Sequence, residues 1–179
     1  LTGFSSRGPA KDGRILPHIV SPGPGGTSHA SPNLAGVFGQ LNQAYRYYNS
    51  NITPESGLLK AIIMNTADDM QNPGPDFQTG FGHVNARRAF EVVRLGQHEN
   101  NFASQGSSQQ HSITVPANVK ELKVMVYWVD WEATAGITTR SLVNDLDIVL
   151  QDPTATNYQP WVLNPTFDPI LLDQNAVRA

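Results

Sequence analysis

The sequence predicts an α/β unit followed by an all-β unit, because its hydrophobic periodicity changes once along the 179 residues. Before residue 97, apolar residues recur at helical spacings of three and four, between loops rich in Gly and Pro. After residue 110 the pattern alternates at every second residue, which is typical of half-buried strands. The polar stretch 98–110 separates the two patterns as a linker would. We therefore expect one domain over residues 1–97 and a second over residues 111–179.

The first unit is expected to begin with a strand and a long helix. Residues 15–20 form a short apolar stretch between loops rich in Gly, Pro and Ser, which predicts a strand. Residues 32–48 predict a helix with one apolar face. Its other positions include the small residues Ala35, Gly36 and Gly39. Small residues allow close approach, so we expect neighbours to pack tightly all round this helix.

Two shorter helices should follow. Thr53 is expected to cap the first of them, with Pro54 at its first position. The second is expected to begin at Asn85 and to run through Val93. Between them, residues 71–78 contain two prolines and a glycine and are expected to form a surface loop.

Three strands are expected in the second unit, over residues 112–115, 122–128 and 146–150. Three strands alone make an exposed and incomplete sandwich. This half of the chain is therefore expected to be only part of an all-β domain.

Composition excludes several classes of protein. The chain has 12 basic and 15 acidic side chains, so nothing indicates a nucleic-acid or membrane-surface partner. Cysteine is absent, which excludes a disulfide framework and leaves the redox compartment undecided. No apolar stretch approaches the roughly 18 residues that a membrane span needs. No signal peptide is visible.

Ser28 is the candidate nucleophile. It follows Gly26 and Thr27, where the glycine lets the backbone turn sharply, and it precedes the long helix. The free N–H groups and the positive end of the helix dipole would stabilise negative charge forming beside its hydroxyl. The alternative reading is a structural one, since serine commonly caps the start of a helix.

Four ordered motifs resemble the subtilisin-like serine proteases, the subtilases. The run GTSHASP at residues 26–32 resembles their active-serine segment. The other three motifs are FSSRGP at residues 4–9 with the stretch 15–23, LKAIIMNTAD at 59–68 and GFGHVNARRA at 80–89. Beyond residue 97 the chain resembles the jelly-roll-like β-sandwich that follows the catalytic domain in some bacterial subtilases. The resemblance implies part of a parallel-sheet α/β domain, followed by part of that sandwich.

The resemblance also implies a serine endopeptidase that cleaves polypeptides through an acyl-enzyme on Ser28. Gly26 and Thr27 would lie near the substrate and the oxyanion. The catalytic Asp and His and the oxyanion Asn would lie upstream of Leu1, with the remainder of the catalytic domain. We therefore expect the isolated chain to be inactive, and marginal, aggregated or partly disordered. A secreted or periplasmic location follows from the family alone.

One departure from the family lies just before Ser28. Subtilases place a further segment, including a strand beside the substrate pocket, between the Ser-Pro-Gly turn and the active-serine motif. Here only Pro24 and Gly25 separate Gly23 from Gly26. We interpret the gap as residues missing from the sequence rather than as a true deletion. The encoding DNA decides between the two.

None of the five histidines is expected to serve as a base for Ser28. His29 is adjacent to it, and neighbours on a helix point about 100° apart. His18 stands where the family usually has an acidic residue. The remaining three are expected to be structural or solvated: His83, His98 and His111.

Two alternatives to the protease stay open. An α/β-hydrolase would use Ser28, Asp68 and His83 in that order, although the run around Ser28 lacks the second glycine of its nucleophile elbow. A non-catalytic pseudo-protease remnant or binding module would retain the fold without the reaction.

A calcium site is also possible in chemical terms. Calcium takes six to eight oxygen ligands, and four oxygen-bearing residues gather near predicted strand ends. The related sandwich binds calcium in some subtilases. The alternative is that Asn144 and Asp145 form a turn and that Asp147 is a solvent-facing strand residue. The four residues are Asp130, Asn144, Asp145 and Asp147.

Overall fold

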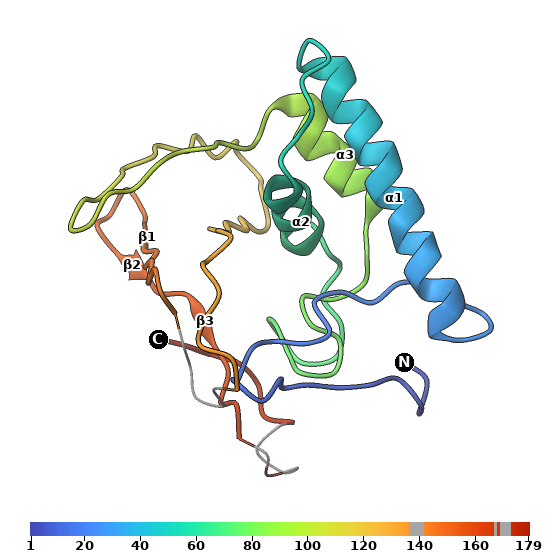
Figure 1. Ribbon diagram of the computed structural model, residues 1–179. Helices are drawn as coiled ribbons and strands as arrows, with labels where there is room; N and C mark the ends of the chain where they lie inside the picture. The colour runs from blue at the N-terminus through green and yellow to red at the C-terminus, as the bar shows by residue number, and fades with distance from the viewer. Residues whose placement is uncertain (137–141, 167, 169–172) are drawn as a thin grey trace.

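The computed structural model describes residues 1–136, 142–166, 168 and 173–179, and these parts contain three helices and four short strands (Figure 1). The helices are α1 (Thr27–Tyr48), α2 (Ser56–Asn65) and α3 (Ala86–Leu95). The strands are β1 (Leu150–Gln151), β2 (Asn157–Tyr158), β3 (Trp161–Val162) and β4 (Val177–Arg178). Two antiparallel pairs form, β1 with β2 and β3 with β4. No helix of the described parts is long and apolar enough to cross a membrane.

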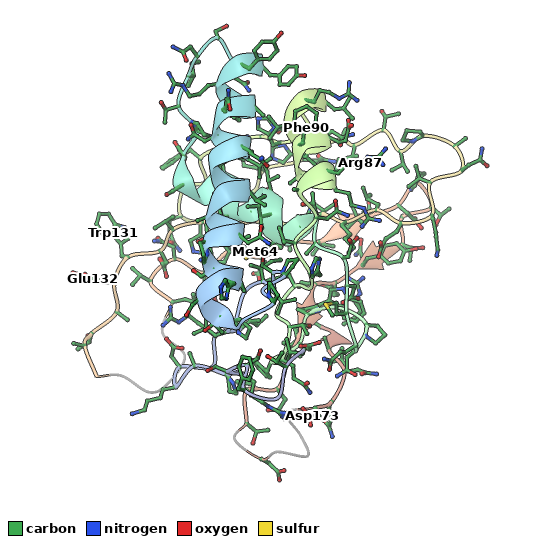
Figure 2. All side chains as sticks on the ribbon, turned by 90° about the vertical axis from the view of Figure 1, so that its right-hand side faces the viewer. Met64, Arg87, Phe90, Trp131, Glu132 and Asp173 are labelled. Carbon is green, nitrogen blue, oxygen red and sulfur yellow. The ribbon has the colours of Figure 1, made fainter. Side chains whose placement is uncertain are left out.

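The main core lies between the three helices, where α1 and α3 run side by side (Figure 1). The apolar residues of α2 recur at spacings of three and four, so they face one side and are buried there. Met64 of α2 is likewise buried in the interior, whereas Trp131 and Glu132 point outward (Figure 2). The buried members of the cluster are Leu41, Leu58, Leu59, Ile62, Ile63, Ala89 and Val93.

The prediction that α1 is enclosed on all sides is wrong for this chain. Leu41 is its one buried residue. A Cβ added at Gly36 or at Gly39 would meet nothing within 4 Å. The small residues of α1 therefore form an open face, because no element among the described residues covers it.

The helix boundaries differ from the predicted ones at two of three starts. α1 begins at Thr27, five residues earlier than expected, and contains Pro32. Because Pro32 has no N–H, it cannot donate to the Ser28 carbonyl one turn earlier. α2 begins at Ser56 with Glu55 at its N-cap, so Thr53 does not cap it.

The start of α3 is as expected. The side chain of Asn85 caps the helix by accepting a hydrogen bond from the Arg88 N–H at 2.9 Å. Gly96 ends the helix in the left-handed conformation, with φ of 63°. A glycine adopts that conformation without the penalty that a Cβ brings.

The expected parallel sheet is reduced to a single bridge among the described residues. Val20, at the end of the predicted strand, pairs in parallel with His83. Its N–H donates to Gly82 at 3.0 Å and its carbonyl accepts from Val84 at 2.9 Å. The α/β character of this unit thus consists of three helices and one parallel contact.

Residues 71–78 are not simply a surface loop, because Phe77 is only 1% exposed. Phe77 packs with Leu163 and Ala176 in a second small core. Asp173 lies at the surface (Figure 2), and its carboxylate accepts a hydrogen bond from the Arg7 side chain at 2.7 Å. This bond is a second link between the C-terminal segment and the first half of the chain. The predicted linker therefore does not prevent the C-terminal segment from packing on the first half of the chain.

The jelly-roll-like sandwich does not form in the described residues. The predicted strands 112–115 and 122–128 belong to no ladder among the described residues. Of the predicted strand 146–150, only Leu150 enters a strand. The described part of residues 108–149 makes no backbone–backbone hydrogen bond. A strand needs neighbours to pair its backbone, and this chain supplies too few of them.

Candidate active site

Ser28 is the second residue of α1, and it is exposed. The N-cap is Gly26, with φ of 117°, and no side chain caps the helix. The hydroxyl of Ser28 makes no hydrogen bond to any other described residue, so the structure gives it no capping role. A serine that is exposed and not hydrogen-bonded is accessible to a reactant from solvent.

The backbone N–H of Ser28 is also unused. The N–H groups of His29 and Ala30 both donate to the Gly26 carbonyl, at 3.0 and 3.2 Å. The Ser28 N–H donates to no acceptor in the described parts of the chain. The first turn of α1 contains no acidic residue, so the positive end of the helix dipole is not compensated there. The Ser28 N–H can therefore donate to an anionic oxygen.

The turn before Ser28 is tightly closed. The Gly26 N–H donates to the Gly23 carbonyl at 3.2 Å. A Cβ at Gly23 would lie 2.6 Å from the Ala30 nitrogen, a contact that no other residue type could accommodate without a shift. The Asn33 side chain donates to the Pro22 carbonyl at 3.1 Å and ties this turn to the helix.

The histidines near Ser28 do not act as its base in this structure. His29 is exposed, and its ring packs over Gly25, where an added Cβ would clash with it. No hydrogen bond joins His29 to Ser28. His18 is half-buried, and its burial, with the charges of Lys60 and Arg14, lowers its pKa and favours the neutral ring.

Of the two histidines near the predicted linker, His98 is less solvated than expected, whereas His111 is exposed as predicted. His98 is half-buried, with its ring centroid 5.5 Å from that of Tyr45. Its Nδ1 is buried without a hydrogen-bond partner among the described residues. His111 pairs with Glu99 at 2.5 Å.

The structure does not assemble the α/β-hydrolase triad. The Asp68 carboxylate accepts from the Asn85 amide at 2.9 Å and pairs with Arg88 at 2.9 Å. His83 meets Asp68 only through the backbone, in two hydrogen bonds of 2.8 Å. Neither residue contacts Ser28 through a hydrogen bond. The sequence did not indicate this arrangement, in which Asp68 holds the start of α3.

Two of the four predicted calcium ligands come together. The Asp130 carboxylate accepts from the Val143 N–H at 2.8 Å and from the Asn144 side chain at 2.8 Å. Burial alone would raise the pKa of Asp130. Hydrogen bonds from Val143 and Asn144 outweigh burial, so the pKa lies below its ordinary value. Asp145 and Asp147 are exposed and are not bonded to this pair. No group of three or more metal-binding side chains exists among the described residues, and the calcium site stays a prediction.

Two surface hollows lie away from Ser28. One of about 440 Å³ lies along the C-terminal half of α1 and the loop after it, between Gly39 and Asn51. Another of about 270 Å³ lies between the first residues of the chain and the loop around Gln78. Neither of these two hollows includes a residue of the active-serine motif, so neither forms a cleft beside Ser28.

Comparisons with known proteins match the first half of the chain to one protease family. The family model described as the subtilase family matches residues 1–82. A C5a peptidase of Streptococcus pyogenes serotype M18 is 28% identical over 148 residues, covering 69% of this chain and 13% of the relative. A C5a peptidase of serotype M6 is 29% identical over 125 residues, covering 58% of this chain and 11% of the relative. The chain thus spans about an eighth of the length of these curated relatives.

The alignment with the serotype M18 protein is longer than the part of this chain that it covers. It spans 148 positions, whereas 69% of 179 residues is about 124. About two dozen aligned positions therefore have no residue in this chain.

Proposed function

Residues 1–82 belong to the subtilase family, and from this premise we propose that the chain is the C-terminal part of a serine protease whose nucleophile is Ser28. The observation that carries this assignment is the state of Ser28. Its side chain is exposed in the first turn of α1, and neither its hydroxyl nor its N–H is used elsewhere in the described structure. A structural serine at a helix start would instead be expected to hydrogen-bond to the helix backbone.

In the proposed reaction the Ser28 hydroxyl oxygen attacks the carbonyl carbon of a peptide bond. A histidine base supplied by the remainder of the domain takes the hydroxyl proton and later gives it to the leaving amine. The Ser28 N–H donates to the oxyanion, an interaction typically worth about 3 kcal/mol in the transition state. Water then hydrolyses the acyl-enzyme and restores the free hydroxyl.

The substrate is a polypeptide. The relatives carry a name that specifies C5a as the target, and we extend only the class of that substrate to this chain. Gly26 and Thr27 precede the nucleophile and would lie beside the bound peptide. The protein would act outside the cytoplasm, in keeping with the family's usual secreted or periplasmic location.

The chain by itself would be inactive. No histidine of the chain hydrogen-bonds Ser28, so nothing in the described structure can accept its proton. The required partner is the remainder of the catalytic domain upstream of Leu1. The open face of α1 around Gly36 and Gly39 is where that remainder would pack, since an added Cβ there meets nothing.

Peptide hydrolysis by the longer protein tests this proposal. Ser28→Ala should lower kcat/KM on a fluorogenic peptide by a factor on the order of 10⁶, as removal of a triad serine does. Ser56→Ala is the matched control, because Ser56 is an exposed serine in the first turn of α2. We expect the control to keep the parent's activity. Activity that survives Ser28→Ala would refute the assignment of the nucleophile.

A further inference from the structure

The stretch 99–111, which follows α3, bonds only to itself among the described residues. It runs away from the three helices (Figure 1), and each of its residues is exposed. Its hydrogen bonds and its ion pair all join two of its own members, such as the Ser107 N–H and the Ser104 carbonyl at 3.0 Å. A Cβ added at Gly106 would meet nothing within 4 Å. The stretch therefore connects the two halves of the chain without holding them together.

The segment 122–129 of the second half is held at the end of α2. The Lys123 ammonium donates to the Ala67 carbonyl just beyond the helix, at 3.2 Å. In return, the Asn65 side chain donates to the Lys123 carbonyl, also at 3.2 Å. The C-terminus of a helix carries the negative end of its dipole, so a cation is favoured there. Lys123 thus joins the second half to α2 by a charge-assisted hydrogen bond.

The same segment also contacts the start of α2. The ring of Tyr127 lies against Gly57, where an added Cβ would come within 3.3 Å of it. The Lys60 ammonium lies 5.4 Å from the centroid of this ring, within the range of a cation–π interaction. Because contacts occur near both ends of α2, they fix the segment along the helix.

A second contact region joins the loop 71–78 to the C-terminal residues. Phe77 of this loop packs with Leu163 in the second small core. The ring of Trp161 lies against Gly74, where an added Cβ would come within 3.0 Å of it. Neither this region nor the contact with α2 includes a residue of the stretch 99–111. The second half is therefore held to the first at two places that do not depend on their covalent connection.

The stretch 99–111 is also the part of the chain best suited to proteolysis. Exposed loops of small and polar residues are where endopeptidases most readily cut a folded chain. Phe102 is the one large apolar residue of the stretch, and it is 78% exposed. A cut would make the contacts between the halves bimolecular, with the loss of an effective concentration of about millimolar order. The two contact regions would then have to hold the pieces together alone.

We propose that the stretch 99–111 is a processing site for an endopeptidase, and that the cut chain persists as a non-covalent complex of its two halves. In the cut, the oxygen of one water adds to a peptide carbonyl carbon and the C–N bond breaks, which leaves a carboxylate and an amine. The contacts with α2 and with the loop 71–78 keep the pieces associated. The site is independent of the protease assignment, because it includes no residue of the active-serine motif.

Limited digestion of the 179-residue chain with chymotrypsin tests the site, because the specificity pocket of this protease is a hydrophobic slot. We expect the first cut after Phe102, with mass spectrometry identifying the pieces 1–102 and 103–179. Phe102→Ser should slow that cut by more than about tenfold. Phe4→Ser is the control, since Phe4 is also exposed, and it should leave the rate unchanged. A first cut at any other bond would overturn the processing site.

Gel filtration of the cut chain tests whether the halves stay together. We expect the two pieces to elute together at the position of the uncut chain and to separate only in urea. Circular dichroism should show the same helical content before and after the cut. Pieces that separate without urea would overturn the complex.

Two variants test the contact with α2 within that complex, with sedimentation velocity of the cut chain giving the dissociation constant. Lys123→Met removes the donor to Ala67 and should raise this constant about tenfold. Lys120→Met is the control, because Lys120 is exposed and bonds to no other described residue. Tyr127→Ala should also weaken the complex, whereas Val126→Ala, at an exposed position, should not. Equal constants for each variant and its control would overturn the role of α2.

Discussion

The two halves of the molecule differ in how much packed and hydrogen-bonded structure they form, although both have few neighbouring elements. In the region from α1 to α3, the core between the helices is closed, with Ile63 only 2% exposed. In residues 108–149, apolar side chains stay exposed and no backbone–backbone hydrogen bond forms among the described residues. The sequence predicts regular structure in both regions, so the difference does not come from their patterning.

The reason is where each element finds its hydrogen-bond partners. A helix pairs its backbone within one segment, so α1 persists even though its Gly36 and Gly39 face is open. A strand pairs its backbone only with another strand, so a stretch such as 122–128 stays unpaired when its neighbours are absent. A partial domain therefore keeps its helices and loses its sheets.

Truncation of a core residue should separate the two regions most clearly. Ile63→Ala removes a fully buried side chain of α2 and should lower the free energy of unfolding by about 2–5 kcal/mol. Val126→Ala, at an exposed position of the segment 122–129, should change it by less than about 0.5 kcal/mol. Urea unfolding followed by circular dichroism measures both. Equal effects of the two substitutions would show that the regions do not differ in packing.

Removal of the α3 cap should have a smaller effect. Asn85→Ala takes away the acceptor for the Arg88 N–H and the donor to Asp68, and it should destabilise the chain by roughly 0.5–2 kcal/mol. Arg87→Ala is the control, because Arg87 projects from the first turn of the same helix (Figure 2) and is exposed. The same urea titration compares them. If Arg87→Ala were as damaging as Asn85→Ala, the cap would not be the cause.

Filling the open face of α1 should be stabilising in this chain. Gly39→Ala replaces a helix-interior glycine where the new methyl group meets nothing, and it should raise the free energy of unfolding by about 1 kcal/mol. In the longer protein the same methyl group would meet the remainder of the domain. There we expect lower activity or a lower yield of folded protein. Thermal unfolding of the chain and peptide hydrolysis by the longer protein give the two readouts, and loss of stability in both would contradict an open face.

The smallest expected effect concerns the β1–β2 hairpin at acid pH. A hydrogen bond from the Thr154 hydroxyl, followed by bonds from the Thr156 N–H and the Tyr158 hydroxyl, lowers the pKa of Asp152 below its ordinary value of 3.8. A depressed pKa in the folded state stabilises the hairpin above the unfolded pKa, and this contribution is lost as the pH falls through the folded pKa. The Thr156 amide proton should therefore shift in NMR spectra only below about pH 4.

Asp152→Asn is the control for that titration. An amide cannot ionise, so the variant should show no acid transition at Thr156. A transition in the natural chain with its midpoint above the ordinary carboxyl value would contradict the assigned hydrogen bonds.

The elements that depend on local sequence could be predicted. The periodicity of α2 and the cap of α3 by Asn85 both follow from residues close together in the chain. The environment of α1 could not be predicted, because glycine and alanine on a helix indicate close neighbours without showing whether those neighbours are present. The buried position of Phe77 was missed for a related reason, since it depends on Leu163 and Ala176 far along the chain.

In the candidate site, too, some features could be predicted from the local sequence and others could not. The position of Ser28 at the start of a helix follows from the motif around it, and the structure places it there. The partners of Asp68 could not be foreseen, because Asn85 and Arg88 reach it only once the closing turn has folded back. The unused N–H of Ser28 could be predicted, because the first N–H groups of a helix have no acceptor within the helix.

Covalent labelling of the longer protein with a fluorophosphonate, followed by mass spectrometry of its peptides, tests the central claim most directly. We expect the phosphonyl group on Ser28, and no label on the 179-residue chain when it is treated in the same way. An unlabelled Ser28 in a longer protein that contains the Asp and His motifs, or a label on a different serine, would contradict the claim that Ser28 is the nucleophile.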